Sequence, residues 1–126
     1  DFSLVDKQTI TAAIQQGGKE ATYLLIHSIE TVNANYAGHA SDDHESRADR
    51  INLEKYQQDL VAQGYLVEIA LGYGNPAKAI AQIVNQSKID LLVLGAHGHK
   101  GIKDIIFGTT LDSLRHRVKV PVLIIR

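Results

Sequence analysis

The chain has no cysteine, only two prolines, and charges that nearly cancel. Without cysteine it has no disulfide framework, no thiolate zinc site and no thiol nucleophile, and a reducing, cytoplasmic setting is favoured. Thirteen basic against fourteen acidic side chains give a formal net charge of -1, so no chain-wide field exists that would hold nucleic acid or an anionic membrane. No apolar run reaches the ~20 residues that a membrane-spanning helix needs.

The sequence also lacks methionine, so we expect that Asp1 is not the natural start and that the chain is a piece of a longer protein. Of its 126 residues, 44% are hydrophobic and 21% are charged, which is the composition of an ordinary globular domain. This length and composition predict a single domain over residues 1–126 with a sizeable core.

Helix-like and strand-like segments alternate along the chain. Continuous apolar strands joined by helices are typical of an α/β fold, in which right-handed crossovers build a parallel sheet covered on both faces. Such a fold normally begins with a strand, whereas here a helix comes first, so one strand is missing from the pattern. The predicted helices cover residues 4–16, 47–63, 76–85 and 108–116, and the predicted strands cover 21–29, 65–71, 89–94 and 120–125.

Residues 91–110 carry the strongest functional signal in the sequence. A buried strand ends at Leu94 and is followed by Gly95 and Gly98, at positions where the backbone must pass close to a ligand. In parallel α/β sheets, ligands bind beyond the carboxyl ends of the strands. The alternative is that these glycines only end a strand, as glycines do in any α/β fold.

A predicted helix begins at Gly108 and continues through Thr109 and Thr110. The free N–H groups at the start of a helix attract anions, and threonine hydroxyls donate to the same oxygens, so this helix start favours a phosphate. Among the basic residues of the preceding loop, His97 is the one that we expect near a phosphate.

The glycines at 95, 98 and 108 together with Thr109 fit the pattern Gly-x2-Gly-x9-Gly-Thr, which resembles the nucleotide-binding signature of the universal stress protein family. Other segments resemble landmarks of that family in the same order along the chain. Residues 1–3 resemble the end of its first strand, 25–27 its second strand, 74–76 the Gly-x-Pro turn before its third helix, and 121–125 its last strand. The resemblance therefore spans the whole chain.

This resemblance implies a flavodoxin-like fold, also called adenine nucleotide alpha hydrolase-like, with parallel strands in the order 3-2-1-4-5. It implies a cytoplasmic stress-response module that binds ATP, with or without Mg²⁺, and forms a homodimer through its last strand. Carried over by position, it assigns the adenosine part to Asp1, the adenine-facing position to Ser28, the base and ribose to Leu94 and Gly95, and the phosphates to His97, Gly98, Gly108, Thr109 and Thr110.

Two features depart from the family pattern. The adenine-facing position is usually apolar in the family, whereas this chain has Ser28, and the first strand is absent before Asp1. Losing a central strand would leave unpaired backbone on both neighbouring strands, at a cost on the order of a few kcal/mol. We therefore expect this strand to lie upstream in the natural protein.

A second resemblance comes from the runs Gly-Ala-His-Gly-His-Lys at 95–100 and Leu-Gly-Tyr-Gly-Asn-Pro at 71–76. Both look like universal stress modules that are fused behind NRAMP-type divalent metal transporters. This resemblance implies covalent linkage to a membrane transporter domain.

Three functions fit these observations, in decreasing order of support. The first is an adenine-nucleotide-binding regulatory module, and the second is a structural dimerisation or docking domain with a vestigial nucleotide site. The third is a metal-responsive module that uses the histidines of 97–99 or the acidic stretch 42–45. The carboxylates of 42–45 are consecutive and no glycine provides a turn, so the stretch fits a solvated loop better than a calcium loop.

No serine, cysteine or paired-carboxylate catalytic set is recognisable, and the glycine loop lacks the Gly-Lys-Ser/Thr end of a P-loop. We therefore expect a binding module rather than an enzyme, with slow ATP hydrolysis left open. His27 lies in an apolar strand and is predicted to be a packed, hydrogen-bonded core residue.

Overall fold

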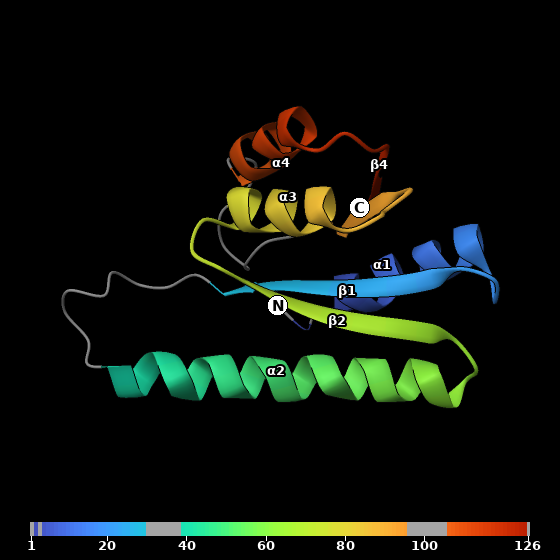
Figure 1. Cartoon of the computed structure of the whole chain (residues 1–126), viewed down its shortest axis with the longest axis horizontal. Helices are drawn as coiled ribbons and strands as arrows, with labels where there is room; N and C mark the ends of the chain where they lie inside the picture. The colour runs from blue at the N-terminus through green and yellow to red at the C-terminus, as the bar shows by residue number, and fades with distance from the viewer. Residues whose placement is uncertain (1, 3, 30–38, 96–105, 126) are drawn as a thin grey trace. The chain divides into compact units, whose positions relative to one another are not determined.

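The computed structural model describes residue 2 and residues 4–29, 39–95 and 106–125 (Figure 1). Helices and strands alternate, which confirms the predicted α/β class. No helix in these ranges combines the length and apolar character needed to cross a membrane. The elements in chain order are α1 (Leu4–Gly17), β1 (Thr22–Ile29), α2 (His39–Ala62), β2 (Leu66–Tyr73), α3 (Pro76–Gln86), β3 (Leu92–Gly95), α4 (Ile106–Arg117) and β4 (Val122–Ile125).

Two helices begin earlier than predicted. Helix α2 starts at His39 instead of residue 47, because its first two turns are polar and carry no apolar period that would reveal them in the sequence. Helix α4 starts at Ile106, two residues before the predicted start at Gly108, so Gly108 is its third residue. The predicted ends of the other elements agree with the structure to within a few residues.

The chain divides into two compact units. The central unit comprises residues 19–80, and the terminal unit comprises residues 1–18 and 81–126. Helix α3 contributes its first residues to the central unit and the remainder to the terminal unit.

The central unit is a pair of parallel strands with one long helix against it. Strands β1 and β2 pair along their full length, from Thr22 opposite Leu66 to Ile29 opposite Tyr73. Figure 1 shows α2 lying along this pair. The helix buries Leu53 and Leu60, which are 5% and 7% exposed. Its Gln57 side chain donates a 2.8 Å hydrogen bond from Nε2 to the carbonyl oxygen of Val67 on β2.

The terminal unit contains the second strand pair. Strands β3 and β4 are parallel, with Leu92 opposite Val122 and Gly95 opposite Ile125, and α1 packs against them. The core of this unit includes Val84 and Leu114, each 1% exposed. Next to them, Asn85 of α3 donates a 2.9 Å hydrogen bond from Nδ2 to the carbonyl oxygen of Arg117, which satisfies one of the free carbonyls at the end of α4.

These two pairs correspond to neighbours in the expected order 3-2-1-4-5, namely the second with the third strand and the fourth with the fifth. Among the described residues, no hydrogen-bonded ladder joins the β1–β2 pair to the β3–β4 pair. A direct ladder between β1 and β3 would have contradicted the expectation that a strand belongs between them. The complete strand order stays a prediction.

A cluster of three side chains holds the amino ends of β1 and β2 together. The Lys19 ammonium lies 3.6 Å from the centroid of the Tyr65 ring and also donates to the carbonyl oxygen of Gln63. Tyr23 meets Tyr65 edge to face, with ring centroids 5.8 Å apart. Burial raises the pKa of the Tyr23 hydroxyl above its ordinary value of 10.0, and the neighbouring Tyr65 contributes in the same direction.

We predict that Lys19→Met lowers the free energy of unfolding by about 0.5–1 kcal/mol, because methionine keeps the aliphatic length but loses the cation that lies over the ring. Urea denaturation measures the change. Lys55→Met, on the exposed side of α2, is the control and should change stability by less than the measurement error. Equal effects of the two substitutions would show that the contact with Tyr65 contributes nothing.

Candidate functional site

The carboxyl ends of β3 and β4 lie at the same edge of the terminal unit, because the two strands are parallel and Gly95 is opposite Ile125. The chain between them must return to the opposite edge before β4 begins, and α4 makes this return. The first turn of α4 therefore belongs to the edge at which β3 ends. This is the edge where parallel α/β folds bind their ligands.

The first turn of α4 has the charge distribution of an anion-binding helix start. It contains Gly108 and Thr109 and carries no acidic side chain that would compete with a bound anion. Its free N–H groups have no partners within the helix. The last turn carries Arg115, His116 and Arg117, which complement the negative end of the helix dipole.

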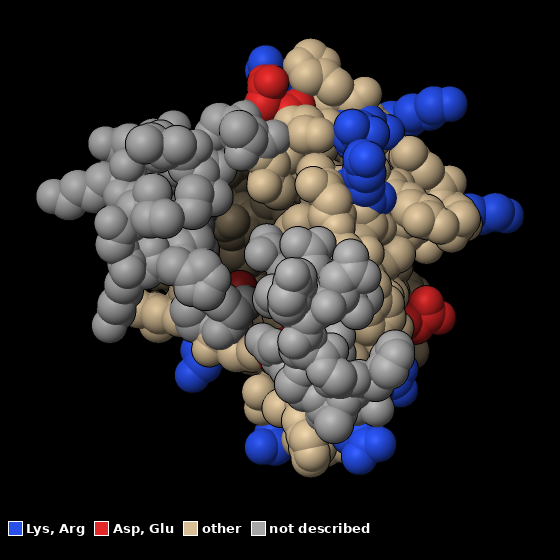
Figure 2. Space-filling view, turned by 90° about the vertical axis from the view of Figure 1, so that its left-hand side faces the viewer, with Lys and Arg blue, Asp and Glu red and all other residues tan. Residues whose placement is uncertain are grey.

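The exposed cations at the end of α4 are partly paired within the helix. Arg115 lies 2.6 Å from a carboxylate oxygen of Asp112, and the guanidinium of Arg117 donates a 2.9 Å hydrogen bond to the hydroxyl of Ser113. Figure 2 shows Lys and Arg side chains at several separate places on the face in view. Because the Arg115–Asp112 ion pair is exposed, it contributes little to stability.

Gly95 lies where helix α1 comes close to the end of β3. A Cβ atom at this position would lie 2.6 Å from Oγ1 of Thr9 and 2.8 Å from Cγ1 of Val5, which is closer than real Cβ atoms come. Thr9 is itself fixed by a 2.7 Å hydrogen bond to the carbonyl oxygen of Val5. Sequence analysis expected a ligand to come close to the backbone at Gly95, and in the structure α1 comes close to it. Contact of Gly95 with a ligand stays a prediction.

The structure brings together only some of the residues that the sequence assigned to the site. Leu94 is half-buried in β3, and Thr110 is half-buried in α4. With Gly95, Gly108 and Thr109 they belong to one strand–helix connection of the terminal unit. Ser28 belongs to the central unit, at the end of β1. Asp1, His97 and Gly98 lie outside the described residues, as do His99 and the remainder of that loop.

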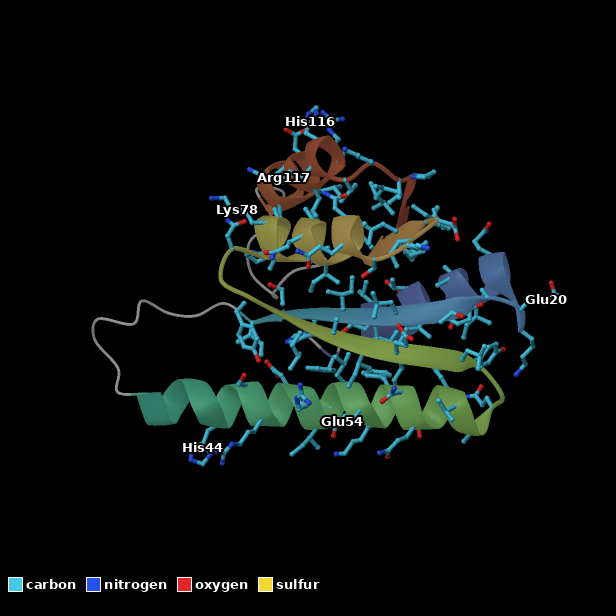
Figure 3. The ribbon with its side chains drawn as sticks, in the orientation of Figure 1. Glu20, His44, Glu54, Lys78, His116 and Arg117 are labelled. Atoms are coloured by element: carbon cyan, nitrogen blue, oxygen red, sulfur yellow. The ribbon has the colours of Figure 1, made fainter. Side chains whose placement is uncertain are left out.

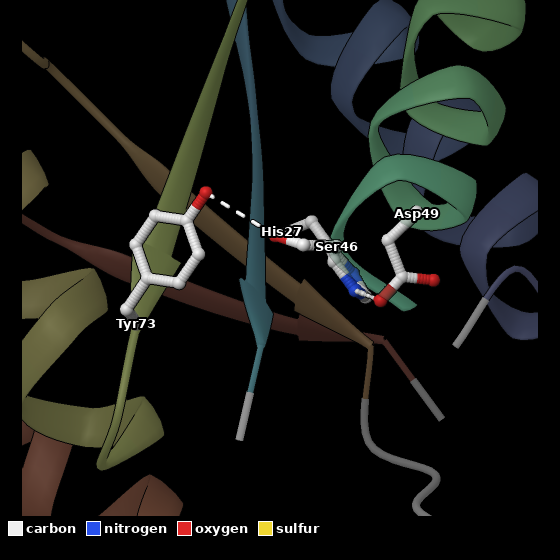
Figure 4. Close-up of polar contacts among 4 residues, drawn as sticks. All are labelled: His27, Ser46, Asp49 and Tyr73. Carbon is white, nitrogen blue, oxygen red and sulfur yellow. Dashed lines mark hydrogen bonds and ion pairs between the residues drawn. The ribbon is translucent and has the colours of Figure 1, made fainter. Parts of the chain in front are cut away.

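His27 and its partner form a polar contact inside the central unit (Figure 4). His27 on β1 lies with Nε2 3.0 Å from Oδ2 of Asp49 on α2, and the two side chains are 18% and 22% exposed. The prediction that His27 is a packed, hydrogen-bonded residue is confirmed. Sequence analysis did not name Asp49 as its partner, although Asp49 lies in the segment 47–63 that was predicted as a helix, one turn before the buried Leu53.

The same helix contributes a second polar contact. The hydroxyl of Ser46 donates to the hydroxyl of Tyr73, at the end of β2, over 3.4 Å. Figure 3 shows His44 pointing away from the β1–β2 pair, and its side chain is exposed. The described residues contain no group of three His, Cys, Asp or Glu side chains that could hold a metal ion.

The described helices and parallel strands define an α/β fold. The family model described as universal stress protein family matches residues 1–126, and the chain belongs to this family. An aligned segment of 75 residues is 33% identical to universal stress protein Slr1230 of Synechocystis. This segment covers 60% of this chain and 26% of that protein. A segment of 74 residues is 24% identical to universal stress protein MJ0577 of Methanocaldococcus jannaschii. It covers 59% of this chain and 46% of that protein. The matched segment thus covers less than half of each relative.

Solved structures confirm the fold over almost the whole chain. The structure of MJ0577 matches with a TM-score of 0.85 at 20% identity, covering 99% of this chain and 90% of that one. A universal stress protein in complex with cAMP matches with a TM-score of 0.71 at 20% identity, covering 98% of this chain and 90% of that one. The α/β fold with parallel strands is therefore the fold of these solved structures.

We predict that Gly95→Ala lowers the free energy of unfolding by about 1–3 kcal/mol, because the added methyl group overlaps Thr9 and Val5. In a background that carries Val5→Ala and Thr9→Ala, Gly95→Ala should lower the free energy of unfolding by less than it does in the wild type. Thermal and urea denaturation of the single and combined variants measure this. An unchanged stability of Gly95→Ala would contradict the packing explanation.

We also predict that His27 and Asp49 stabilise the central unit as a pair. A double-mutant cycle with His27→Ala and Asp49→Ala should give a coupling free energy of about 0.5–1.5 kcal/mol. Pairing Asp49→Ala with Ser46→Ala provides the matched control from the same helix, and this cycle should be additive. A His27–Asp49 coupling no larger than that of the control would mean that the contact contributes nothing to stability.

Proposed function

We propose that this chain binds an adenine nucleotide, with ATP as the first candidate, and acts as a regulatory module in a stress response. The observation that carries the proposal is the first turn of α4, which has free N–H groups and no acidic side chain at the edge where β3 ends. Membership of the universal stress protein family supports it, as does the relative in complex with cAMP.

In this proposal the N–H groups of the first turn of α4 donate to phosphate oxygens, and the hydroxyls of Thr109 and Thr110 add further donors. One charge at a helix start gains only about 0.3–1 kcal/mol from the dipole at an exposed position. The directed hydrogen bonds therefore have to supply most of the affinity. Leu94 contributes apolar surface for the base and ribose, and His97 and Gly98 contact the phosphates as the family resemblance implies.

The proposal is for binding without turnover. Hydrolysis needs a group that activates water and a carboxylate that orients Mg²⁺ against the phosphates. The first turn of α4 offers hydrogen-bond donors and contains no carboxylate. Mg²⁺ would then act as a counter-charge carried by the nucleotide and not as an ion held by this helix.

Three finer features belong to the same proposal. A homodimer through the last strand is supported by β4, whose partner among the described strands is β3 alone and whose Ile124 is 39% exposed. A cytoplasmic location and covalent linkage to a divalent metal transporter rest on the resemblances described above. Sequencing the natural gene upstream of residue 1 tests the linkage directly.

A structural docking domain with a vestigial nucleotide site is the second candidate. The observation that favours it is the contact of α1 with Gly95, because packing alone then explains why glycine is needed there. The two candidates differ in what a negative charge at the start of α4 should do.

We predict that Gly108→Asp weakens ATP binding at least ten-fold, because a carboxylate in the first turn repels the phosphates and competes for the same N–H groups. The fold should be kept, since an acidic side chain at a helix start is favourable for the helix. Calorimetric titration with ATP and Mg²⁺ measures the affinity, and circular dichroism monitors the fold.

Gly108→Asn is the matched control, because asparagine has nearly the shape of aspartate without its charge, and it should lose less affinity. If the wild-type chain binds no ATP, or if the Asp and Asn variants bind equally well, the nucleotide proposal is wrong and the docking function is favoured.

A further inference from the structure

Strand β2 has one edge paired with β1 and an outer edge that faces away from it. Among the described strands, its partner is β1 alone. Successive residues of a strand direct their backbone N–H and C=O groups to opposite edges. The N–H group of Gly74, directly after β2, donates to the carbonyl oxygen of Ile29 on β1 over 3.0 Å, so the even-numbered residues of β2 direct these groups toward β1. The backbone groups of Val67, Ile69 and Leu71 therefore lie at the outer edge.

The sequence of β2 favours pairing of this edge with another strand. Its eight residues read Leu-Val-Glu-Ile-Ala-Leu-Gly-Tyr, with Glu68 as the one charged residue and no proline. At the two ends of the strand, Leu66 and Tyr73 are 62% and 56% exposed. A long and largely apolar edge is a template to which a strand of another molecule can add, and natural proteins block such edges.

A side chain of α2 covers part of the outer edge. Gln57 donates a 2.8 Å hydrogen bond from Nε2 to the carbonyl oxygen of Val67. It shares a helix face with Leu53, four residues before it, and Leu60, three residues after it, and both of these leucines are buried. This face of α2 would accept an apolar side chain at position 57, so packing alone does not explain a glutamine there.

The amide of Gln57 stands where a neighbouring strand would have to come. Paired strands lie about 4.8 Å apart, and an added strand would place its own N–H group against the carbonyl oxygen of Val67. Because Gln57 Nε2 is already 2.8 Å from that oxygen, the added strand must displace the amide first.

A second copy of the chain presents the same edge. Two identical edges related by a two-fold axis meet antiparallel, so the amide of each copy opposes the contact. If the two strands cross at Ile69, Glu68 of one copy lies opposite Ala70 of the other. The charge of Glu68 therefore does not prevent this pairing, and the amide of Gln57 does.

We infer that Gln57 is an edge guard, whose amide keeps the outer edge of β2 from pairing with β2 of a second copy of the chain. The inference does not depend on nucleotide binding. It concerns a surface of the central unit, whereas the homodimer proposed above uses β4 of the terminal unit.

Gln57→Leu tests the inference because leucine has no donor for the carbonyl of Val67. This variant should self-associate about ten-fold or more tightly than the wild type, measured by sedimentation over a range of concentrations. Gln58→Leu is the matched control, since it adds the same apolar side chain at an exposed position of the same helix. The control should associate no more than the wild type does.

Gln57→Glu separates the open edge from a loss of stability. Glutamate loses the same hydrogen bond, because an ionised carboxylate cannot donate, but it places a negative charge at the edge of each copy. This variant should be destabilised and should keep the oligomeric state of the wild type, since like charges oppose the pairing.

Amide hydrogen exchange locates the surface. In the wild type, the amides of Ile69 and Leu71 should exchange faster than those of Ala70 and Gly72, which are directed toward β1. In associated Gln57→Leu, the amides of Ile69 and Leu71 should become protected.

Four outcomes would overturn the inference. They are equal protection of Ile69 and Ala70 in the wild type, unchanged association of folded Gln57→Leu, association of Gln58→Leu or Gln57→Glu to the same extent, and association that leaves Ile69 and Leu71 unprotected. If circular dichroism shows that Gln57→Leu is unfolded, Gln57→Ala takes its place. If both are unfolded, the amide is required for folding and the inference is wrong.

Discussion

Parallel pairing of neighbouring strands is the constraint on which the rest of this structure depends. A parallel pair needs a connection that returns the chain to the edge from which the first strand started. Helix α2 makes this return between β1 and β2, and α4 makes it between β3 and β4. Each of these helices therefore begins at the edge where its strands end. This topology places the start of α4 at the edge where β3 ends.

Gly95 and Ser28 illustrate two ways in which a strand end is adapted for its surroundings. At Gly95 the absent side chain makes room for α1, whose Val5 and Thr9 occupy the space that a Cβ atom would need. At Ser28 a side chain is present but has no partner among the described residues. The need for glycine at position 95 is therefore explained by packing within the terminal unit.

The central unit shows how much of a polar contact depends on helix position. The apolar character of β1 predicted that His27 is packed, because a polar side chain in such a strand has to find a partner. The identity of that partner depends on which positions of α2 face the strands, and Asp49 lies in the predicted segment 47–63, one turn before the buried Leu53. The apolar stripe of this segment places Asp49 on the inward face, but which side chain of the strands it meets depends on how the helix packs against them.

The sequence by itself determined the α/β class, the alternation of elements and the glycine-threonine signature of the family, because these depend on the local period of apolar residues and on short spacings. It also identified the strand–helix connection that contains Leu94, Gly95 and Thr110. Only the tertiary structure decided that α1 is the close neighbour of Gly95 and that Asp49 is the partner of His27. It also decided that the Ser28 hydroxyl is buried with no hydrogen-bond partner among the described residues. Such facts join residues that are distant in the chain or concern a side chain's surroundings. They depend on how the elements pack against one another, which no local pattern specifies.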